Sequence, residues 1–148
     1  MRHLSRVFRS LLVACATFAT MVFTPPAAAA VAPEDAQSIQ KVVQAQLAAF
    51  AADDARLAFS FAAPNIRTLF ETPENFLAMV RKGYPVVYRP ASVLFLTPKA
   101  LDGEIVQPVH MRDSQGSAWI VMYTLRRQAD ASWRISSCVL VENKTQAV

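Results

Sequence analysis

The chain has 148 residues, 53% of them hydrophobic, and a formal net charge of +4 at pH 7. This length fits one domain with an ordinary hydrophobic core and excludes two. With only 2 cysteines in the sequence, a scaffold held together by several disulfides is excluded as well.

The first thirty residues have the pattern of an export signal. A basic head with three arginines precedes the apolar stretch 11–23, and the alanines at 27–30 follow it. This order of basic, apolar and small residues predicts cleavage after Ala30. We therefore expect residues 31–148 to form a single exported domain, either periplasmic or secreted.

Two other roles for the leader compete with a cleaved signal. The apolar stretch is shorter than the roughly 20 residues of a membrane helix, and Pro25 and Pro26 would interrupt it, so we expect no stable membrane anchor after cleavage. Residues 12–15 resemble a lipobox, which would make Cys15 the lipidated N-terminus of a lipoprotein. Against this, the apolar core before Cys15 is short, and the segment after it is apolar where a polar tether is usual.

Removing the leader changes the charge and the cysteine content of the chain. Its arginines account for much of the basic excess, so that residues 31–148 are close to neutral. The basic pairs at 81–82 and 126–127 are isolated and do not form the patch that nucleic-acid binding requires, so we expect no nucleic-acid partner. Cys138 is then the last cysteine, and we expect it to be a small buried apolar side chain rather than a nucleophile.

The first half of the exported domain is predicted to be helical. Apolar residues at three- and four-residue spacing, with a proline in the first turn, indicate one amphipathic helix over 33–52. A short helix ending at Pro64 and a further turn or two at 65–70 follow. Thr72 is a favourable cap for another helix, which Gly83 ends in the conformation that glycine tolerates.

The second half is predicted to form strands. Residues 84–88 are bounded by prolines, and we expect a short edge or connecting strand there. An Asp-Gly pair and two further polar turns separate the other strands, which we place at 92–96, 104–112, 119–127 and 133–141. Short connections indicate an antiparallel meander. N-terminal helices followed by such a meander define an α+β fold, a curved sheet packed on the long helix as a cone with a pocket at its open end.

Four segments of the chain resemble a known family. They read AFSFAAP at 58–64, TPENF at 72–76, GYPVVYRP at 83–90 and WRISSC at 133–138. With the order of elements, they resemble the nuclear-transport-factor-2-like superfamily and, within it, a bacterial family, the domain of unknown function 4864. The resemblance implies the cone-shaped fold. It implies no catalytic residues, because the family has no agreed activity and the superfamily includes isomerases, dehydratases and non-enzymatic modules.

Tyr84, Tyr88 and Arg89 are the candidate ligand-binding residues. They bracket a short segment between the helices and the sheet, where aromatic rings and a guanidinium could orient a small anionic ligand at the pocket mouth. The alternative is structural: the tyrosines pack the seam between helix and sheet, and Arg89 pairs with an acidic residue.

His110 is the weak candidate for catalysis, as a proton acceptor. In strict alternation it shares a strand face with Val106 and Pro108, and no second partner is identifiable nearby. Asp53 and Asp54 are expected to serve capping and turn formation rather than substrate binding. No spacing of His, Cys and acidic residues indicates a metal site, and no cofactor is implied.

These patterns favour a non-enzymatic exported module that binds a small ligand or another protein. Trp119 and Tyr123 share one face of their strand, which indicates either core or a sheet surface through which a homodimer forms. The alternative function is a small-molecule isomerase or hydrolase that uses a pocket acid or base.

Overall fold

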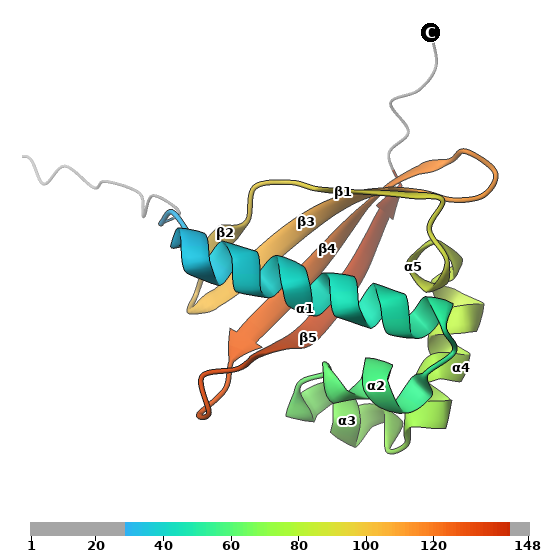
Figure 1. The fold of residues 1–148 in the computed structure, drawn as a ribbon, viewed down its shortest axis with the longest axis horizontal. Coiled ribbons are helices and arrows are strands. Elements are labelled where there is room, and N and C mark those ends of the chain that lie inside the picture. The colour runs from blue at the N-terminus through green and yellow to red at the C-terminus, as the bar shows by residue number, and fades with distance from the viewer. Residues whose placement is uncertain (1–28, 143–148) are drawn as a thin grey trace, which may run out of the picture.

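A long helix, α1 (Pro33–Ala51), lies across one face of an antiparallel sheet (Figure 1) in this computed structural model, which describes residues 29–142. Pro33 takes the first position of α1, and the acidic Glu34 and Asp35 lie in its first turn, where the helix dipole favours them. The helix predicted over 33–52 is confirmed. The body of the predicted export signal, with Cys15, lies outside the described residues.

Four shorter helices follow and close one end of the cone (Figure 1). Their bounds are α2 (Ala55–Ser60), α3 (Pro64–Phe70), α4 (Pro73–Gly83) and α5 (Pro85–Tyr88). The Asp54 side chain accepts a hydrogen bond from the Leu57 amide at 2.9 Å and caps α2. The Thr72 hydroxyl accepts one from the Asn75 amide at 3.1 Å and caps α4. Both caps agree with the sequence expectation.

The strand predicted over 84–88 is wrong, because Pro85–Tyr88 form the short helix α5 and Tyr84 precedes it. Pro85 occupies its first helical position, where the missing amide hydrogen costs nothing. The amides of Val87 and Tyr88 both donate to the Tyr84 carbonyl, each at 2.9 Å. Val86 and Val87 are buried in the core, and this burial stabilises a turn that β-branched residues alone would not favour.

The sheet is antiparallel throughout and confirms the predicted meander. Its strands are β1 (Ser92–Phe95), β2 (Lys99–Leu101), β3 (Glu104–Arg112), β4 (Ala118–Arg127) and β5 (Trp133–Glu142). The order is β1-β3-β4-β5, and β2, which the sequence analysis did not foresee, pairs with the other end of β3. Asp102 and Gly103 turn the chain between β2 and β3 with φ angles of 49° and 78°, as a two-residue hairpin requires.

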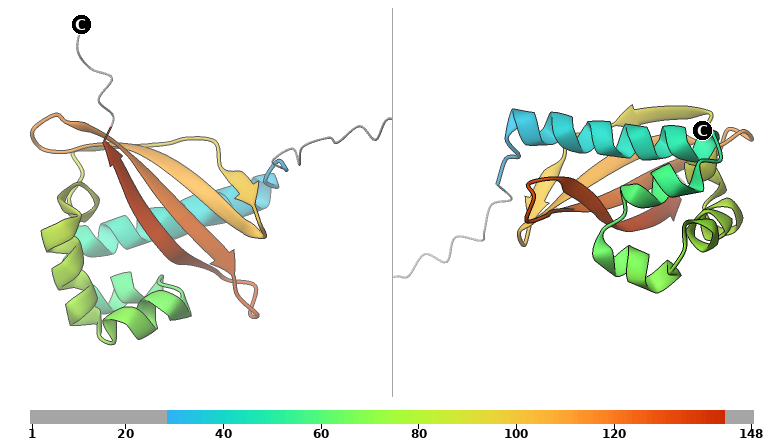
Figure 2. Two further views of the ribbon diagram at one scale, coloured as in Figure 1. Left: turned by 180° about the vertical axis from the view of Figure 1, so that it is seen from behind. Right: turned by 60° about the horizontal axis from the view of Figure 1, so that its bottom comes forward.

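The two faces of the sheet differ in burial. The inner face packs on α1, and its buried side chains are Ile105, Gln107, Val109, Met111, Val121, Tyr123 and Leu125. Tyr123 is therefore core, and Trp119 lies partly buried against that core. Among residues 29–142, no helix covers the outer face, as the view from behind shows (Figure 2). In residues 29–142, no helix is long and apolar enough to cross a membrane.

Candidate functional site

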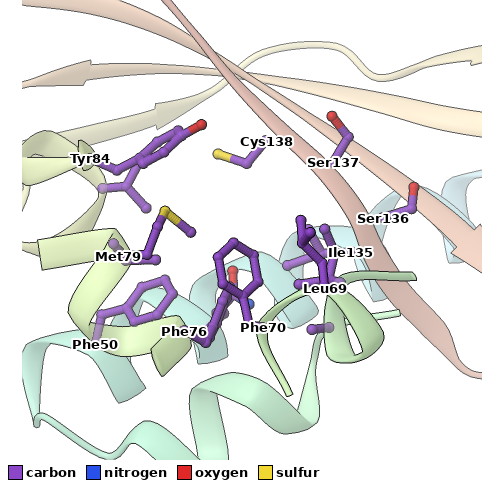
Figure 3. A pocket seen from close by; sticks show the side chains of 15 residues that line it. Phe50, Leu69, Phe70, Phe76, Met79, Tyr84, Ile135, Ser136, Ser137 and Cys138 are labelled. Carbon is purple, nitrogen blue, oxygen red and sulfur yellow. The ribbon is translucent and has the colours of Figure 1, made fainter. Parts of the chain in front are cut away.

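A cavity of about 230 Å³ lies between the helices and strand β5 (Figure 3). Helices α1, α3, α4 and α5 contribute to its wall, and residues 135–138 of β5 close it. The lining side chains come from Gln46, Phe50, Ala62, Ile66, Leu69, Phe70, Phe76, Met79, Val80, Tyr84, Val87, Ile135, Ser136, Ser137 and Cys138. None of them carries a charge at neutral pH, so the cavity suits a neutral, mostly apolar molecule.

Aromatic rings form one part of the wall. Phe76 of α4 lies at their centre, with ring centroids 5.7 Å from Phe50 and 5.6 Å from Phe70. Phe59 of α2 also packs against Phe76, with ring centroids 5.5 Å apart. These tilted contacts are in the range that aromatic pairs prefer. They fix the rings of four helices, α1 to α4, against one another and give the cavity a preformed aromatic end.

A bulge in β5 shapes the opposite wall. The register between β4 and β5 shifts between Thr124 and Leu125, which leaves Ser136 without a cross-strand partner. The Ser136 hydroxyl instead donates to the Thr124 carbonyl at 3.2 Å, and the Asn65 amide donates to the Ser136 carbonyl at 2.9 Å. A bulge changes the direction in which the side chains that follow it point. Here the three residues from Ser136 to Cys138 all contribute to the cavity lining.

Burial changes the chemistry of two neighbouring polar groups at this wall, the Cys138 thiol and the Tyr123 hydroxyl. Desolvation raises the pKa of the Cys138 thiol to about 12, so the thiol stays protonated and is a poor nucleophile. Desolvation also raises the pKa of Tyr123 well above its ordinary value, with a further contribution from the Cys138 thiol. Cys138 is of intermediate burial as a residue, and the desolvation of its thiol agrees with the small buried side chain that the sequence predicts.

The Tyr123 hydroxyl is the unusual group in this pair. Tyr123 is 0% exposed, and within residues 29–142 its hydroxyl has no hydrogen-bond partner of regular geometry. The Cys138 thiol is close enough to perturb its pKa, but sulfur is a weak acceptor. Leaving a buried hydroxyl unsatisfied costs about 1–3 kcal/mol, and such a group calls for an explanation.

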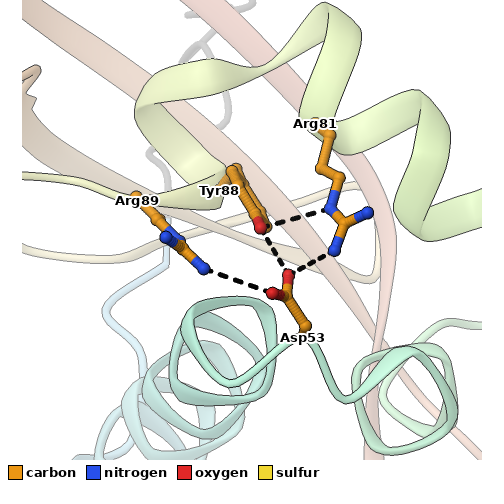
Figure 4. A network of polar contacts seen from close by, with 4 residues as sticks. All are labelled: Asp53, Arg81, Tyr88 and Arg89. Atoms are coloured by element: carbon orange, nitrogen blue, oxygen red, sulfur yellow. Dashed lines mark hydrogen bonds and ion pairs between the residues drawn. The ribbon is translucent and has the colours of Figure 1, made fainter.

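The structure separates the three predicted ligand-binding residues. Tyr84 lines the cavity. Tyr88 and Arg89 lie outside it, in a surface network around Asp53 (Figure 4). There the Asp53 carboxylate accepts hydrogen bonds from Tyr88, from Arg81 at 2.6 Å and from Arg89 at 3.2 Å. Arg89 thus pairs with an acidic residue, as in the structural alternative given for it.

This network holds α4 and α5 to the end of α1. Hydrogen bonds from Arg81 and then from Tyr88 are the main causes that lower the pKa of Asp53. The carboxylate therefore stays ionised, and it already occupies the two guanidinium groups that an anionic ligand would need. Asp53 itself adopts a φ of 57°, a turn conformation that aspartate tolerates. Sequence analysis assigned Asp53 to a turn but missed its contacts with Arg81 and Arg89.

His110 lies away from the cavity. It belongs to the outer face of β3, opposite Leu94 of β1 and Ile120 of β4 in register, and its side chain is partly buried. It is not part of the cavity lining. Within the described chain, no group of three or more His, Cys, Asp and Glu residues is arranged to hold a metal ion.

Gln46 is a cavity residue that the sequence analysis missed. It sits among apolar residues on the inner side of α1 and is 3% exposed. Its amide nitrogen donates to the Ala58 carbonyl at 3.1 Å, so that it ties α1 to α2. The signal was present in the sequence, because a glutamine at a core position of an amphipathic helix requires a partner.

A helix wrapped by a curved antiparallel sheet, with a cavity between the helices and the sheet, defines the cone of the nuclear-transport-factor-2-like fold. Residues 32–148 match the family described as Domain of unknown function (DUF4864), and the chain belongs to this family. The solved structure of Aln2 from a Streptomyces species is similar at a TM-score of 0.54 and 19% identity, over 77% of this chain and 94% of that one. This likeness concerns the fold. No curated protein sequence matches the chain.

Proposed function

We propose that this protein is an exported, non-enzymatic module that binds a neutral apolar small molecule in the cavity beside β5. The observation that carries the proposal is the cavity itself, which has an aromatic end and no charged residue in its wall. Such preformed apolar cavities with a few polar groups are typical ligand sites. The export part rests on the pattern of residues 1–30.

The composition of the wall favours binding over catalysis. Isomerases and hydrolases need an acid or base whose pKa lies near the working pH. Among the described residues, the cavity wall contains no His, Asp, Glu or Lys side chain, and the pKa of Cys138, which lines it, is raised to about 12. His110 lies on the outer face of the sheet, so a reaction in the cavity would have to proceed without it.

Filling the cavity is expected to abolish ligand binding without unfolding the protein. The test uses N-phenyl-1-naphthylamine, a neutral dye whose fluorescence rises in apolar surroundings. Met79 lines the cavity from α4, and Met79→Trp places an indole in the space that the dye needs. We expect the dye to bind the parent protein and to bind Met79→Trp about tenfold or more weakly.

The matched control is Leu57→Trp, because Leu57 is 46% exposed on α2 and does not line the cavity. It should bind the dye as the parent does. Failure of the parent protein to bind the dye, or equal binding by Met79→Trp, would contradict the proposed site.

We also propose that two copies pair through the outer face of the sheet. A two-fold interface brings the same patch of each copy together, so charges near its centre repel. The centre of this face consists of Pro108, Met122 and Val139, which are aligned across three strands and uncharged. Val139 is 51% exposed and lies beside the equally exposed Val141.

A charge at this centre should separate the copies. We expect the parent protein to have the mass of a dimer by light scattering after gel filtration, and Val139→Glu to have the mass of a monomer. Leu57→Glu adds the same charge at an exposed position away from the sheet and should remain dimeric. A monomeric parent protein would rule out the interface.

A further inference from the structure

The two ends of the cavity differ in chemistry. Figure 3 shows Phe50, Phe70 and Phe76 around its lower part, whereas the hydroxyl of Tyr84 and the sulfur of Cys138 occupy its upper part. A phenol hydroxyl and a thiol can each donate a hydrogen bond. A ligand that fills this space therefore meets aromatic rings at one end and hydrogen-bond donors at the other.

The buried Tyr123 hydroxyl lies directly behind the donor end. Tyr123 and Cys138 are cross-strand partners on β4 and β5, and their side chains interact. Tyr123 is sealed from solvent and its hydroxyl lacks a regular partner among the described residues. If this hydroxyl donates a hydrogen bond to the sulfur of Cys138, the thiol hydrogen of Cys138 points away from Tyr123. Cys138 borders the cavity, so the cavity is the space into which that hydrogen then points.

We propose that the ligand is a neutral aromatic molecule carrying one hydrogen-bond-accepting oxygen, such as an aryl ketone. Its rings pack on the phenylalanines, and its oxygen accepts hydrogen bonds from Tyr84 and Cys138. Tyr123 is a positioning residue, which orients the Cys138 thiol toward the ligand. This inference rests on the proposed function and specifies the ligand class for the same cavity.

The size of the cavity agrees with this class. An apolar cavity of about 150 Å³ holds one benzene molecule, and the cavity described above measures about 230 Å³. It therefore has room for a ring system larger than benzene together with a small substituent. A charged group would be buried here without an opposite charge, which is costly.

The test compares two probes of nearly equal shape, 2-acetylnaphthalene and 2-isopropylnaphthalene, of which only the first has an acceptor oxygen. The measured quantity is the ratio of their dissociation constants, obtained by displacement of N-phenyl-1-naphthylamine. Using a ratio cancels general effects of a mutation on the cavity. The sequence has 3 tyrosines, which supply matched variants that each lose one hydroxyl and keep the ring.

We expect Tyr84→Phe and Tyr123→Phe each to reduce the preference for the ketone by about three- to tenfold, the worth of one hydrogen bond. Tyr88→Phe is the control, because the Tyr88 hydroxyl lies in the Asp53 network outside the cavity. It should keep the parent ratio. A purely structural role for Tyr123 would alter stability and leave the ratio unchanged.

The outcomes separate this inference from the proposed function. If neither naphthalene binds the parent protein, the proposed function fails and the inference fails with it. If both bind but Tyr84→Phe or Tyr123→Phe keeps the parent ratio, the inference alone is overturned. The same conclusion follows if Tyr88→Phe lowers the ratio as much as the other two variants do.

Discussion

Replacing Phe76 with alanine is expected to lower the free energy of unfolding by about 3–5 kcal/mol. Phe76 is 7% exposed, and its ring contacts those of Phe50, Phe59 and Phe70. Its loss removes buried apolar area and the aromatic contacts together. The space it leaves adjoins the existing cavity, and the surrounding helices are held by separate hydrogen bonds, so we expect little collapse to offset the loss.

Urea unfolding followed by circular dichroism measures this change. Phe76→Leu retains most of the buried volume and should lose less than about 1.5 kcal/mol. Leu69→Ala also removes an apolar side chain from the cavity wall, but Leu69 is 70% exposed, so its loss should be small. A Phe76→Ala protein as stable as Leu69→Ala would show that Phe76 does not anchor the aromatic end of the cavity.

The sequence predicted those elements whose signals are local. The long helix follows from apolar spacing and from Pro33 at its start, and α4 follows from the Thr72 cap. The hairpin at Asp102 follows from the backbone that an Asp-Gly pair allows. In each case the side chains that determine the structure are within a few residues of the element they form.

Two elements were missed because their signals are ambiguous or absent. Proline begins helices as readily as it limits strands, and the burial that decides for a helix at Pro85 depends on distant parts of the chain. Strand β2 has three residues, Lys99–Leu101, which is too short for a recognisable alternation. Its pairing with the far end of β3 is set by the fold and not by its own composition.

The sequence placed Tyr84 and Tyr88 in one candidate site, but only Tyr84 lines the cavity. This separation of the two tyrosines has a structural cause. Tyr84 and Tyr88 are one helical turn apart, which suggests a shared face. However, Tyr84 is the residue before α5 and has a φ of −133°, outside the helical range. Its side chain therefore reaches the cavity, whereas Tyr88 contacts Asp53, a residue 35 positions earlier. Contacts at that separation depend on how α1 and α5 pack.

Alkylation of Cys138 is expected to be about a thousandfold slower in the native protein than in the unfolded chain. The thiolate is the form that reacts, and burial raises the pKa of the Cys138 thiol from 9.0 to about 12. At about pH 8, this change lowers the thiolate fraction by nearly three orders of magnitude. Iodoacetamide labelling with and without urea, followed by mass spectrometry of the peptide containing Cys138, measures both rates.

Rapid labelling of the native protein would show that Cys138 is an activated thiol, which would contradict the non-enzymatic proposal more directly than any change in ligand binding. It would also remove the protonated donor that the proposed ketone site requires. Slow labelling in the native state with normal labelling in urea supports both, since the same burial that suppresses the thiolate maintains the thiol as a donor facing the cavity.

The raised pKa of Cys138 also predicts how stability depends on pH. The unfolded thiol loses its proton near 9.0, whereas the native thiol keeps it until about 12. Between these values the native state binds more protons, so the free energy of unfolding falls as the pH rises. From about pH 8 to about pH 10, the parent protein should lose about 1.4 kcal/mol more than Cys138→Ala does. Because each protein is compared with itself, the packing cost of the alanine cancels. Equal losses would show that the native thiol ionises as freely as an exposed one, and the cavity wall at Cys138 would then be open to water.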